Sequence, residues 1–336
     1  MAPFVMRYCD DHGADERLNN DHRLALIRFR EPVAAETDDP RQCVIPLPEL
    51  GGTATAEIWI SPSPVQVGRV SGVSYADNGE ALFLQLQSDE YAPDALQPVT
   101  AIAYRRLFAV ARAQGYPHLL RIWNYLPDIN EEYGGLERYR AFCAGRRQVL
   151  DATLGEVETR WPAASAIGFP KSFARVGEDV GEGLRLYALA GRDAGEQIEN
   201  PRQISAFHYP PEYGPRSPSF SRAVLKRWGD GHYHLYISGT ASVVGHASRH
   251  GNLLAQLDET LVNLDALLTE ASRRAATPLQ PALLRIYVRT DSDPAPLRER
   301  IVQAFGRAVP MVFLQGDVCR RELLIEIEGL AVSTAG

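Results

Sequence analysis

Two glutamates alternate with isoleucines near the carboxyl end of the chain, in the segment Ile325-Glu-Ile-Glu328. If this segment forms a strand, the isoleucines point to one face of a sheet and the glutamates to the other. A carboxyl group held in an apolar setting has a raised pKa and can act as a general acid near neutral pH. The same pattern also fits a strand whose second face is wet and carries two solvated glutamates. The segment therefore predicts either a catalytic acid or an ordinary solvated sheet face.

A second segment whose residue types could bind a ligand runs from Phe207 to Arg222. It is rich in proline, aromatic residues and arginine. Its density of proline and glycine excludes a helix or a central strand. Tyr213 and Arg216 in this loop could bind a planar anion, because arginine offers a fork of donors and tyrosine offers a face and a hydroxyl. A packed surface loop that only connects two elements is the alternative.

A third candidate lies between Glu137 and Arg146. On a helix, Tyr139, Phe142 and Arg146 share one face because they are spaced three and four residues apart. A tyrosine and an arginine on neighbouring turns could hold an anionic ligand. The alternative is a core aromatic residue with a basic side chain at its rim.

These candidates must be positioned by a chain that repeats itself. The string Leu-Leu-Arg-Ile occurs at residues 119–122 and again at 283–286. Each copy lies in a predicted strand that follows a predicted long helix, over about 98–114 in the first half and 252–273 in the second. We therefore predict two similarly folded halves. Further predicted elements are strands at 72–75, 81–86, 164–169, 184–189, 232–237, 309–314 and 323–330, short helices at 136–146 and 295–305, and a loop at 238–242.

The order of these elements predicts an α+β fold of two fused domains, each a mixed β-sheet covered by helices on one face. We expect an N-terminal extension over residues 1–45, with one strand at 24–29 and a polar linker. The first domain should cover 46–195 and end in a turn-rich stretch, and the second should cover 196–336. The strand of the first half that corresponds to the glutamate-bearing strand carries no carboxylate, so a glutamate acid would mean one active site rather than two.

The composition limits the class of protein. Hydrophobic residues make up 45% and charged residues 23% of the 336 residues, which is ordinary globular usage. The 35 basic and 42 acidic residues give a formal charge of −7, which argues against a nucleic-acid or anionic-membrane partner. Four separated cysteines without a CxxC pair point to a reducing cytoplasm. The eight histidines have no acidic or cysteine partner at a recognised ligand spacing, so we expect no metal. We also expect no nucleotide cofactor, because no glycine-rich phosphate loop is present.

Several segments between about residues 70 and 331 together resemble the chorismatase family. The C-terminal half also resembles the RidA/YjgF fold, in the Ser-Gly that opens the predicted loop at 238–242, the helix over 256–268 and the closing strand over 324–331. The resemblance therefore implies two fused RidA/YjgF-like domains. The segments that carry the chorismatase resemblance are 121–130, 137–146, 166–170, 237–242 and 318–328.

The resemblance implies an enzyme that cleaves chorismate and releases pyruvate without a cofactor. The family's catalytic glutamate falls on Glu326, which would protonate the methylene carbon of the enolpyruvyl ether. Cysteine at the position of Cys319 and glycine near Gly239 are found in the branch that forms 3-hydroxybenzoate. The positions implied for substrate binding, together with our candidates for the second anionic end of the substrate, are Tyr139, Arg146, Tyr213, Arg216, Gly239 and Thr240.

Alternatives stay open at this point. The product could be 3-hydroxybenzoate alone or together with 4-hydroxybenzoate, or water could add and give a dihydroxycyclohexadiene carboxylate. A RidA-like enamine or imine deaminase and a non-catalytic small-molecule binding module are further alternatives. Cys319 could also be an inert buried thiol. The oligomeric state is open, with a monomer as one option, because two fused halves could supply contacts that a single-domain relative obtains from neighbours.

Overall fold

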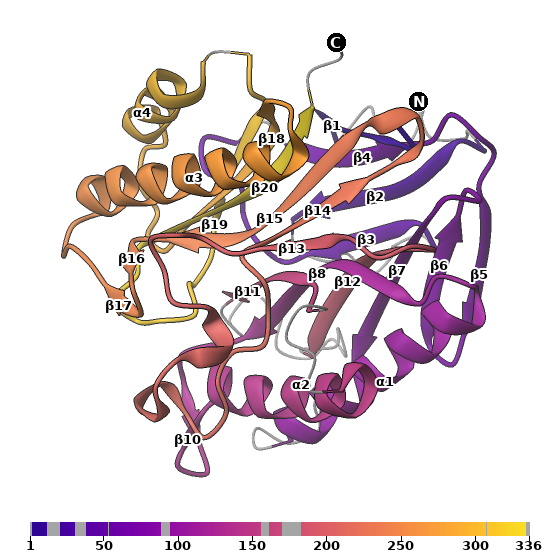
Figure 1. Ribbon diagram of the computed structural model, residues 1–336. Helices are drawn as coiled ribbons and strands as arrows, with labels where there is room; N and C mark the ends of the chain where they lie inside the picture. Colours follow the sequence, from indigo (N-terminus) through magenta and orange to yellow (C-terminus); the bar gives the residue numbers. More distant parts are fainter. Residues whose placement is uncertain are drawn as a thin grey trace.

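The computed structural model describes residues 2–11, 21–30, 38–52, 54–88, 95–155, 161–169, 183–306 and 308–333. The described strands form one four-stranded and two six-stranded sheets, with two short hairpins besides. Figure 1 shows the sheets in the middle of the molecule, with helices α1 and α2 on one side and α3 and α4 on the other. The molecule is therefore a set of sheets enclosed between two helical layers.

The four-stranded sheet is built from the N-terminal part of the chain. Its strands are β1 (Val5–Asp10), β2 (Arg23–Phe29), β3 (Gln42–Ile45) and β4 (Thr55–Ile60), in the order β1-β4-β2-β3. The prediction of a single N-terminal strand is wrong, because three further short strands that lack a long apolar run join β2 in one sheet: β3 and β4 pair with β2, and β1 pairs with β4. The boundary predicted at residue 45 stays a prediction. Strand β4 follows this boundary in the chain and lies between β1 and β2 in the sheet, pairing with both.

The first six-stranded sheet follows, in the order β11-β8-β12-β7-β6-β5. The strands predicted at 72–75 and 81–86 are β6 and β7, which pair as a hairpin, and Gly79 in its turn has a φ of 90°, which glycine adopts without strain. Helix α1 ends at the predicted position, whereas α2 runs on well past residue 146. The elements of this half are β5 (Gln66–Val70), β6 (Val73–Asp77), β7 (Ala81–Ser88), α1 (Leu96–Ala113), β8 (His118–Pro127), β9 (Glu132–Tyr133), β10 (Leu136–Glu137), α2 (Arg138–Leu154), β11 (Ala163–Phe169) and β12 (Leu184–Gly191).

The second six-stranded sheet has the order β13-β14-β15-β20-β18-β19. Counted along each half, both sheets have the strand order 1-2-3-6-4-5, with a long helix after the third strand and a shorter one after the fourth. The predicted duplication and the α+β class are therefore confirmed. The elements of this half are β13 (Glu196–Ile198), β14 (Ala223–Arg227), β15 (Tyr233–Ala241), β16 (Val243–Val244), β17 (Ala247–Ser248), α3 (Leu253–Ala275), β18 (Leu279–Val288), α4 (Ala295–Phe305), β19 (Met311–Gln315) and β20 (Ile325–Ser333), with 3₁₀ turns at Ala206–His208, Pro211–Tyr213 and Gly229–Gly231.

The loop predicted at 238–242 is wrong, since β15 continues through residue 241. Its register against β20 shifts between Ile237 and Thr240, where one extra residue forms a β-bulge. A sequence reader sees Ser-Gly there and expects a turn, but pairing with β20 keeps the chain extended on both sides of the bulge. The bulge therefore places Ser238 and Gly239 inside the sheet.

Each six-stranded sheet has one face covered by its own helices and the other turned toward the molecular centre. The central core unites residues of all three large sheets, for example Trp59, Trp123 and Tyr287. The two halves are also joined by main-chain hydrogen bonds, from Gly168 N–H to Asp317 O over 2.8 Å and from Asp317 N–H to Gly168 O over 2.9 Å. In the described part of the chain, no helix combines the length and apolarity that a membrane crossing requires.

Candidate active site

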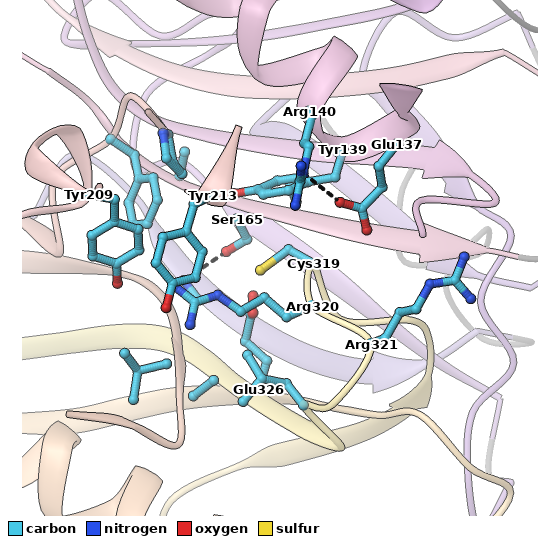
Figure 2. Close-up of a pocket in the computed structure, with 18 of the residues that line it drawn as sticks. Glu137, Tyr139, Arg140, Ser165, Tyr209, Tyr213, Cys319, Arg320, Arg321 and Glu326 are labelled. Carbon is cyan, nitrogen blue, oxygen red and sulfur yellow. Dashed lines mark hydrogen bonds and ion pairs between the residues drawn. The ribbon is translucent and has the colours of Figure 1, made fainter. Parts of the chain in front are cut away.

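A cavity of about 380 Å³ lies between the two halves of the molecule. The first half contributes side chains from α2 and β11, and the second contributes them from β15, the segment before β14 and the connection from β19 to β20. Figure 2 shows Tyr139, Cys319, Arg320 and Glu326 converging on this space. A cavity of this size suits a small-molecule ligand, and neither half builds it alone.

Glu326 contributes a buried carboxyl group to the cavity. As predicted, Ile325 and Ile327 pack into the core beneath the helices of the second half, so Glu326 and Glu328 point to the opposite face. That face is dry, because Glu326 is 4% and Glu328 2% exposed. The alternative of two solvated glutamates is therefore wrong: the first half of the molecule covers this face of β20.

The protonation of Glu326 follows from its surroundings. Burial raises the pKa of the Glu326 carboxyl to about 8, and the negative charge of Glu328 adds to the rise. Arg121 and Arg222 act in the opposite direction without cancelling it. At neutral pH the side chain is therefore a neutral acid that can donate a proton.

Gly239 is required by the position of that carboxyl group. A Cβ atom built on Gly239 would lie 1.8 Å from Oε1 and 2.5 Å from Cδ of Glu326. The acid therefore lies against the main chain of the β-bulge, in the space that any other side chain would occupy. The Gly239 N–H donates a hydrogen bond of 2.9 Å to Oγ of Ser165 on β11, which ties the bulge to the first half.

Two buried arginines offer positive charge to the cavity. Arg146 on α2 is 2% exposed, and its guanidinium lies 4.9 Å from the ring centre of Phe142. Arg222 is 6% exposed and donates from Nη2 to the carbonyl oxygen of Ile204 over 2.8 Å and to Tyr209 Oη over 2.7 Å. The Nε–H groups of both arginines are buried without a hydrogen-bond acceptor in the described part of the chain. Both arginines line the cavity, so each can bind an anionic ligand group there.

Tyr139 and Cys319 line the cavity together. Their side chains lie close together (Figure 2), and burial together with the nearby Glu326 raises the pKa of the Cys319 thiol to about 12. Cys319 is therefore a neutral thiol at neutral pH, which excludes a thiolate nucleophile at this position.

An aromatic cover closes another side of the cavity. The guanidinium of Arg320 lies 4.2 Å from the ring centre of Tyr213 and 5.2 Å from that of Tyr209. Its Nη1 donates to the carbonyl oxygen of His246 over 2.9 Å, and Tyr213 Oη lies 3.2 Å from Nδ1 of the same histidine. The segment from Phe207 to Arg222, which is rich in proline, tyrosine and arginine, therefore covers the cavity. This agrees with its interpretation as a binding loop rather than as a loop that only connects two elements.

Not every predicted site residue lies here. Arg216 is exposed and does not line the cavity. Thr240 is buried and donates from Oγ1 to the carbonyl oxygen of Ser238 over 3.0 Å; it also lies outside the lining, because successive residues of β15 face opposite sides of the sheet. The structure brings together the other six predicted residues, which are Tyr139, Arg146, Tyr213, Gly239, Cys319 and Glu326.

Sequence reasoning missed Ser165, Arg222 and Arg320, which also line the cavity. A hydroxyl inside the otherwise apolar strand at 164–169 was the available signal for Ser165. Arg222 ends the proline-rich segment and Arg320 follows Cys319, so both lay in segments already singled out. Their roles depend on which way the side chain points, and neither segment has a periodic pattern that would fix this direction.

Comparison with known proteins agrees with this geometry. A family model described as the N-terminal part of FkbO/Hyg5-like chorismatases matches residues 57–177. A 3-hydroxybenzoate synthase of Streptomyces hygroscopicus is 35% identical over 292 residues, covering 82% of this chain and 81% of that protein. A chorismatase of Streptomyces rapamycinicus is 35% identical over 286 residues, with the same coverage of both chains. A crystal structure of a chorismatase superposes with a TM-score of 0.81 at 31% identity, covering 97% of this chain and 98% of that one. The chain therefore belongs to the chorismatase family.

Proposed function

We propose that this protein cleaves chorismate to pyruvate and 3-hydroxybenzoate, with Glu326 as the general acid. A relative named 3-hydroxybenzoate synthase supports this product. The observation that carries the proposal is a carboxyl group whose pKa is raised to about 8, placed in a cavity lined by several arginines. A proton donor beside cationic groups is the arrangement that protonation of an anionic enol ether requires.

The chemical step begins at the methylene carbon of the enolpyruvyl group. Glu326 donates its proton to this carbon, which becomes a methyl group, and positive charge develops on the neighbouring carbon and the ether oxygen. The ring hydroxyl next to the ether carbon then attacks this carbon as its bond to the ether oxygen breaks, and the ether oxygen leaves as the carbonyl of pyruvate. The attacking hydroxyl gives its proton back to Glu326. Its oxygen then lets go of its original ring carbon, the ether carbon loses its hydrogen as a proton, and protonation of the oxygen gives the phenol of 3-hydroxybenzoate. Chorismate has the same atoms as pyruvate and 3-hydroxybenzoate together, so this route consumes no water. A positioned general acid typically contributes about 10²–10⁴-fold to such a step.

Binding of the substrate falls to the buried cations. Chorismate carries two carboxylates, and we assign Arg146 and Arg222 to them because each is a buried cation that lines the cavity. Tyr139 lines the cavity from the same helix as Arg146, and Arg320 adds positive charge under the aromatic cover. The formal charge of the whole chain is −7, so attraction of a dianion depends on this local group of arginines.

Cys319 is proposed to decide the fate of the ring. Its neutral thiol fills space beside Glu326 and cannot activate water as a base at neutral pH. A site that keeps water away favours the intramolecular route to the aromatic product over addition of water. Mixed 3- and 4-hydroxybenzoate and the hydrated diene are the other outcomes that a product analysis would reveal.

Incubation of the purified protein with chorismate tests the function directly. We expect pyruvate and 3-hydroxybenzoate in equal amounts, measured by a coupled assay for pyruvate and by chromatography of the ring product. Absence of pyruvate above the uncatalysed background would overturn the proposal. Release of pyruvate and ammonia from 2-aminoacrylate, without turnover of chorismate, would instead support a deaminase.

Replacing Glu326→Gln tests the assignment of the acid. The amide keeps the shape of the side chain but has no proton to give, so we expect kcat to fall by at least about 10²-fold while chorismate still binds. Binding is measured by calorimetry with the variant. Activity within a few fold of the unchanged protein would place the acid elsewhere.

Replacing Cys319→Ala tests the control of the product. The smaller side chain leaves room for a water molecule beside the reacting carbon, so we expect a larger share of the dihydroxycyclohexadiene carboxylate. Cys43→Ala, a buried cysteine that does not line the cavity, is the matched control. The same product ratio in all three proteins would show that Cys319 does not steer the reaction.

We further infer a monomer acting in a reducing compartment such as the cytoplasm. Both halves of the cavity come from one chain, and the described part of the chain contains no disulfide. Sedimentation of the purified protein tests the first inference, since an obligate oligomer would sediment above the mass of one chain. Localisation of a tagged chain tests the second.

A further inference from the structure

Glu328 lies two residues beyond Glu326 on the same face of β20, but its carboxylate is surrounded by cations and hydrogen-bond donors. Arg121 donates from Nη2 to Glu328 Oε2 over 2.5 Å, and Arg285 donates from Nη1 to Oε1 over 2.8 Å. Tyr287 Oη and Trp123 Nε1 also donate to Oε1, over 2.8 and 3.0 Å. Two guanidinium groups and two neutral donors therefore hold Glu328 as a carboxylate. Glu326, by contrast, has no ion pair within 4.0 Å in the part of the chain that the structure describes.

Ser165 connects Glu328 to the acid's resting place. Its Oγ–H donates to the Glu328 carboxylate, and the same oxygen accepts the Gly239 N–H over 2.9 Å. Gly239 is the residue against which the Glu326 carboxyl lies. A continuous path therefore runs from the buried charge of Glu328 through one hydroxyl to the main chain beneath the acid.

We propose that Glu328 and Ser165 are positioning residues for the acid: the fixed charge of Glu328 keeps the proton on Glu326, and Ser165 fixes the Gly239 peptide beneath it. The first role is electrostatic, because a second negative charge on the same face of β20 is unfavourable in a dry site. The second role is geometric, because Ser165 Oγ accepts the Gly239 N–H directly beneath the acid, while the neighbouring Ser238 Oγ accepts the Ala164 N–H over 2.9 Å and holds the other residue of the bulge to β11. Both roles rest on the proposed assignment of Glu326 as the acid.

The groups around Glu326 act on its protonation in both directions. Burial and Glu328 favour the protonated form, whereas Arg121 and Arg222 favour the carboxylate. Loss of Glu328 alone would leave Arg121 without its partner and tilt the balance toward the carboxylate. The titratable or charged groups that face Glu326 are Glu328 on β20, Arg121 on β8, Arg222 before β14, Tyr287 on the adjacent strand β18, and Cys319 and Arg320 in the connection that precedes β20.

The pH dependence of kcat/KM for chorismate separates these effects. In the unchanged protein kcat/KM should fall tenfold per pH unit above about pH 8, because the acid is then deprotonated. In Glu328→Gln we expect this alkaline limb to move down by about one to two pH units, with activity recovered at pH 6. A uniform loss at every pH, with the limb unmoved, would overturn the electrostatic role.

Two further variants serve as reciprocal test and matched control. Arg121→Gln removes a charge that favours the carboxylate, so its alkaline limb should move up, and this variant keeps the proposal testable if Glu328→Gln does not fold. Glu57→Gln removes another fully buried carboxylate that pairs with Arg285 over 2.6 Å, but Glu57 is not among the charges that act on Glu326. Its limb should stay in place even if its thermal stability falls. A limb that moves equally in the Glu57 and Glu328 variants would mean that general damage, rather than the local charge, sets the protonation.

Ser165→Ala tests the geometric role separately. It keeps the charge of Glu328 but removes the acceptor of the Gly239 N–H, so we expect kcat to fall by about tenfold or more with KM and the limb nearly unchanged. Unchanged kcat would overturn this role. The outcomes also distinguish this inference from the proposed function. If Glu326→Gln stays active, the acid itself is misassigned. If Glu326→Gln is inactive but the alkaline limb of Glu328→Gln does not move, only the positioning role is refuted.

Discussion

Glu326 and Glu328 show how little of a residue's chemistry is contained in its type. They are the same amino acid, two positions apart on one strand, and both are nearly fully buried. Glu328 has two arginine partners and is a structural anion, whereas Glu326 has none within ion-pair distance among the described residues and holds a proton. Sequence could place both on one face of a strand, but it could not say which would have the cations, since Arg121 and Arg285 are far away along the chain.

The proton on Glu326 should also affect stability. In the folded chain its pKa is about 8 against an ordinary value of 4.5, so between these pH values the folded state binds a proton that the unfolded state has lost. Stability therefore falls as pH rises through this window, by about 1.4 kcal/mol per pH unit. We expect Glu326→Gln to be more stable than the unchanged protein at pH 8 and nearly equal to it at pH 4.5, measured by urea unfolding.

A surface carboxylate provides the comparison for this experiment. Glu299 on α4 is exposed, so Glu299→Gln should change the free energy of unfolding little at either pH. A stability difference for Glu326→Gln that is the same at pH 4.5 and pH 8 would contradict a raised pKa at this position.

At the scale of elements, the β-bulge in β15 is the feature that places the acid. Gly239→Ala would put a methyl group 1.8 Å from the present position of Glu326 Oε1, so the carboxyl group must move. The strand pairing on either side does not depend on the glycine, and we expect the variant to fold. A displacement of this size should lower kcat by about 10–10²-fold, measured with chorismate.

Gly251, which precedes α3, is the matched control for this substitution. A Cβ on Gly251 would meet no atom within 4 Å, so Gly251→Ala should leave kcat unchanged. If Gly239→Ala were as active as Gly251→Ala, the close approach of Glu326 to the bulge would have no catalytic meaning.

The elements also show where sequence reasoning succeeds and where it stops. The repeated strand at 119–122 and 283–286 and the long helix before each copy were predictable, because their periodic apolar patterns arise from burial on one face. The N-terminal sheet was mostly missed, since β1, β3 and β4 are short and gain their stability only from pairing with distant strands. The loop expected at 238–242 failed for a related reason: a Ser-Gly pair suggests a turn, and only pairing with β20 converts it into a bulge.

At the scale of the whole molecule, Arg285 joins all three large sheets. From β18 it donates to Glu57 on β4 over 2.6 Å, to Glu328 on β20 over 2.8 Å and to Tyr187 Oη on β12 over 2.6 Å. Because these partners come from the N-terminal sheet and from both halves, the cavity between the halves depends on a charge cluster in the central core. The acid and its surroundings are therefore a property of the assembled chain rather than of either half.

Replacing Arg285→Met should consequently destabilise the whole molecule. It leaves Glu57 buried without its cation and removes one of the two cations on Glu328, and loss of one partner from a buried ion pair typically costs about 3–5 kcal/mol. Urea unfolding measures this cost, and adding Glu57→Gln should restore part of it, because the uncompensated charge is then gone. Arg300→Met, which breaks an ion pair with Asp258 between half-exposed side chains, should cost less than about 1 kcal/mol. If the two arginine variants lost equal stability, the buried cluster would not be what holds the three sheets together.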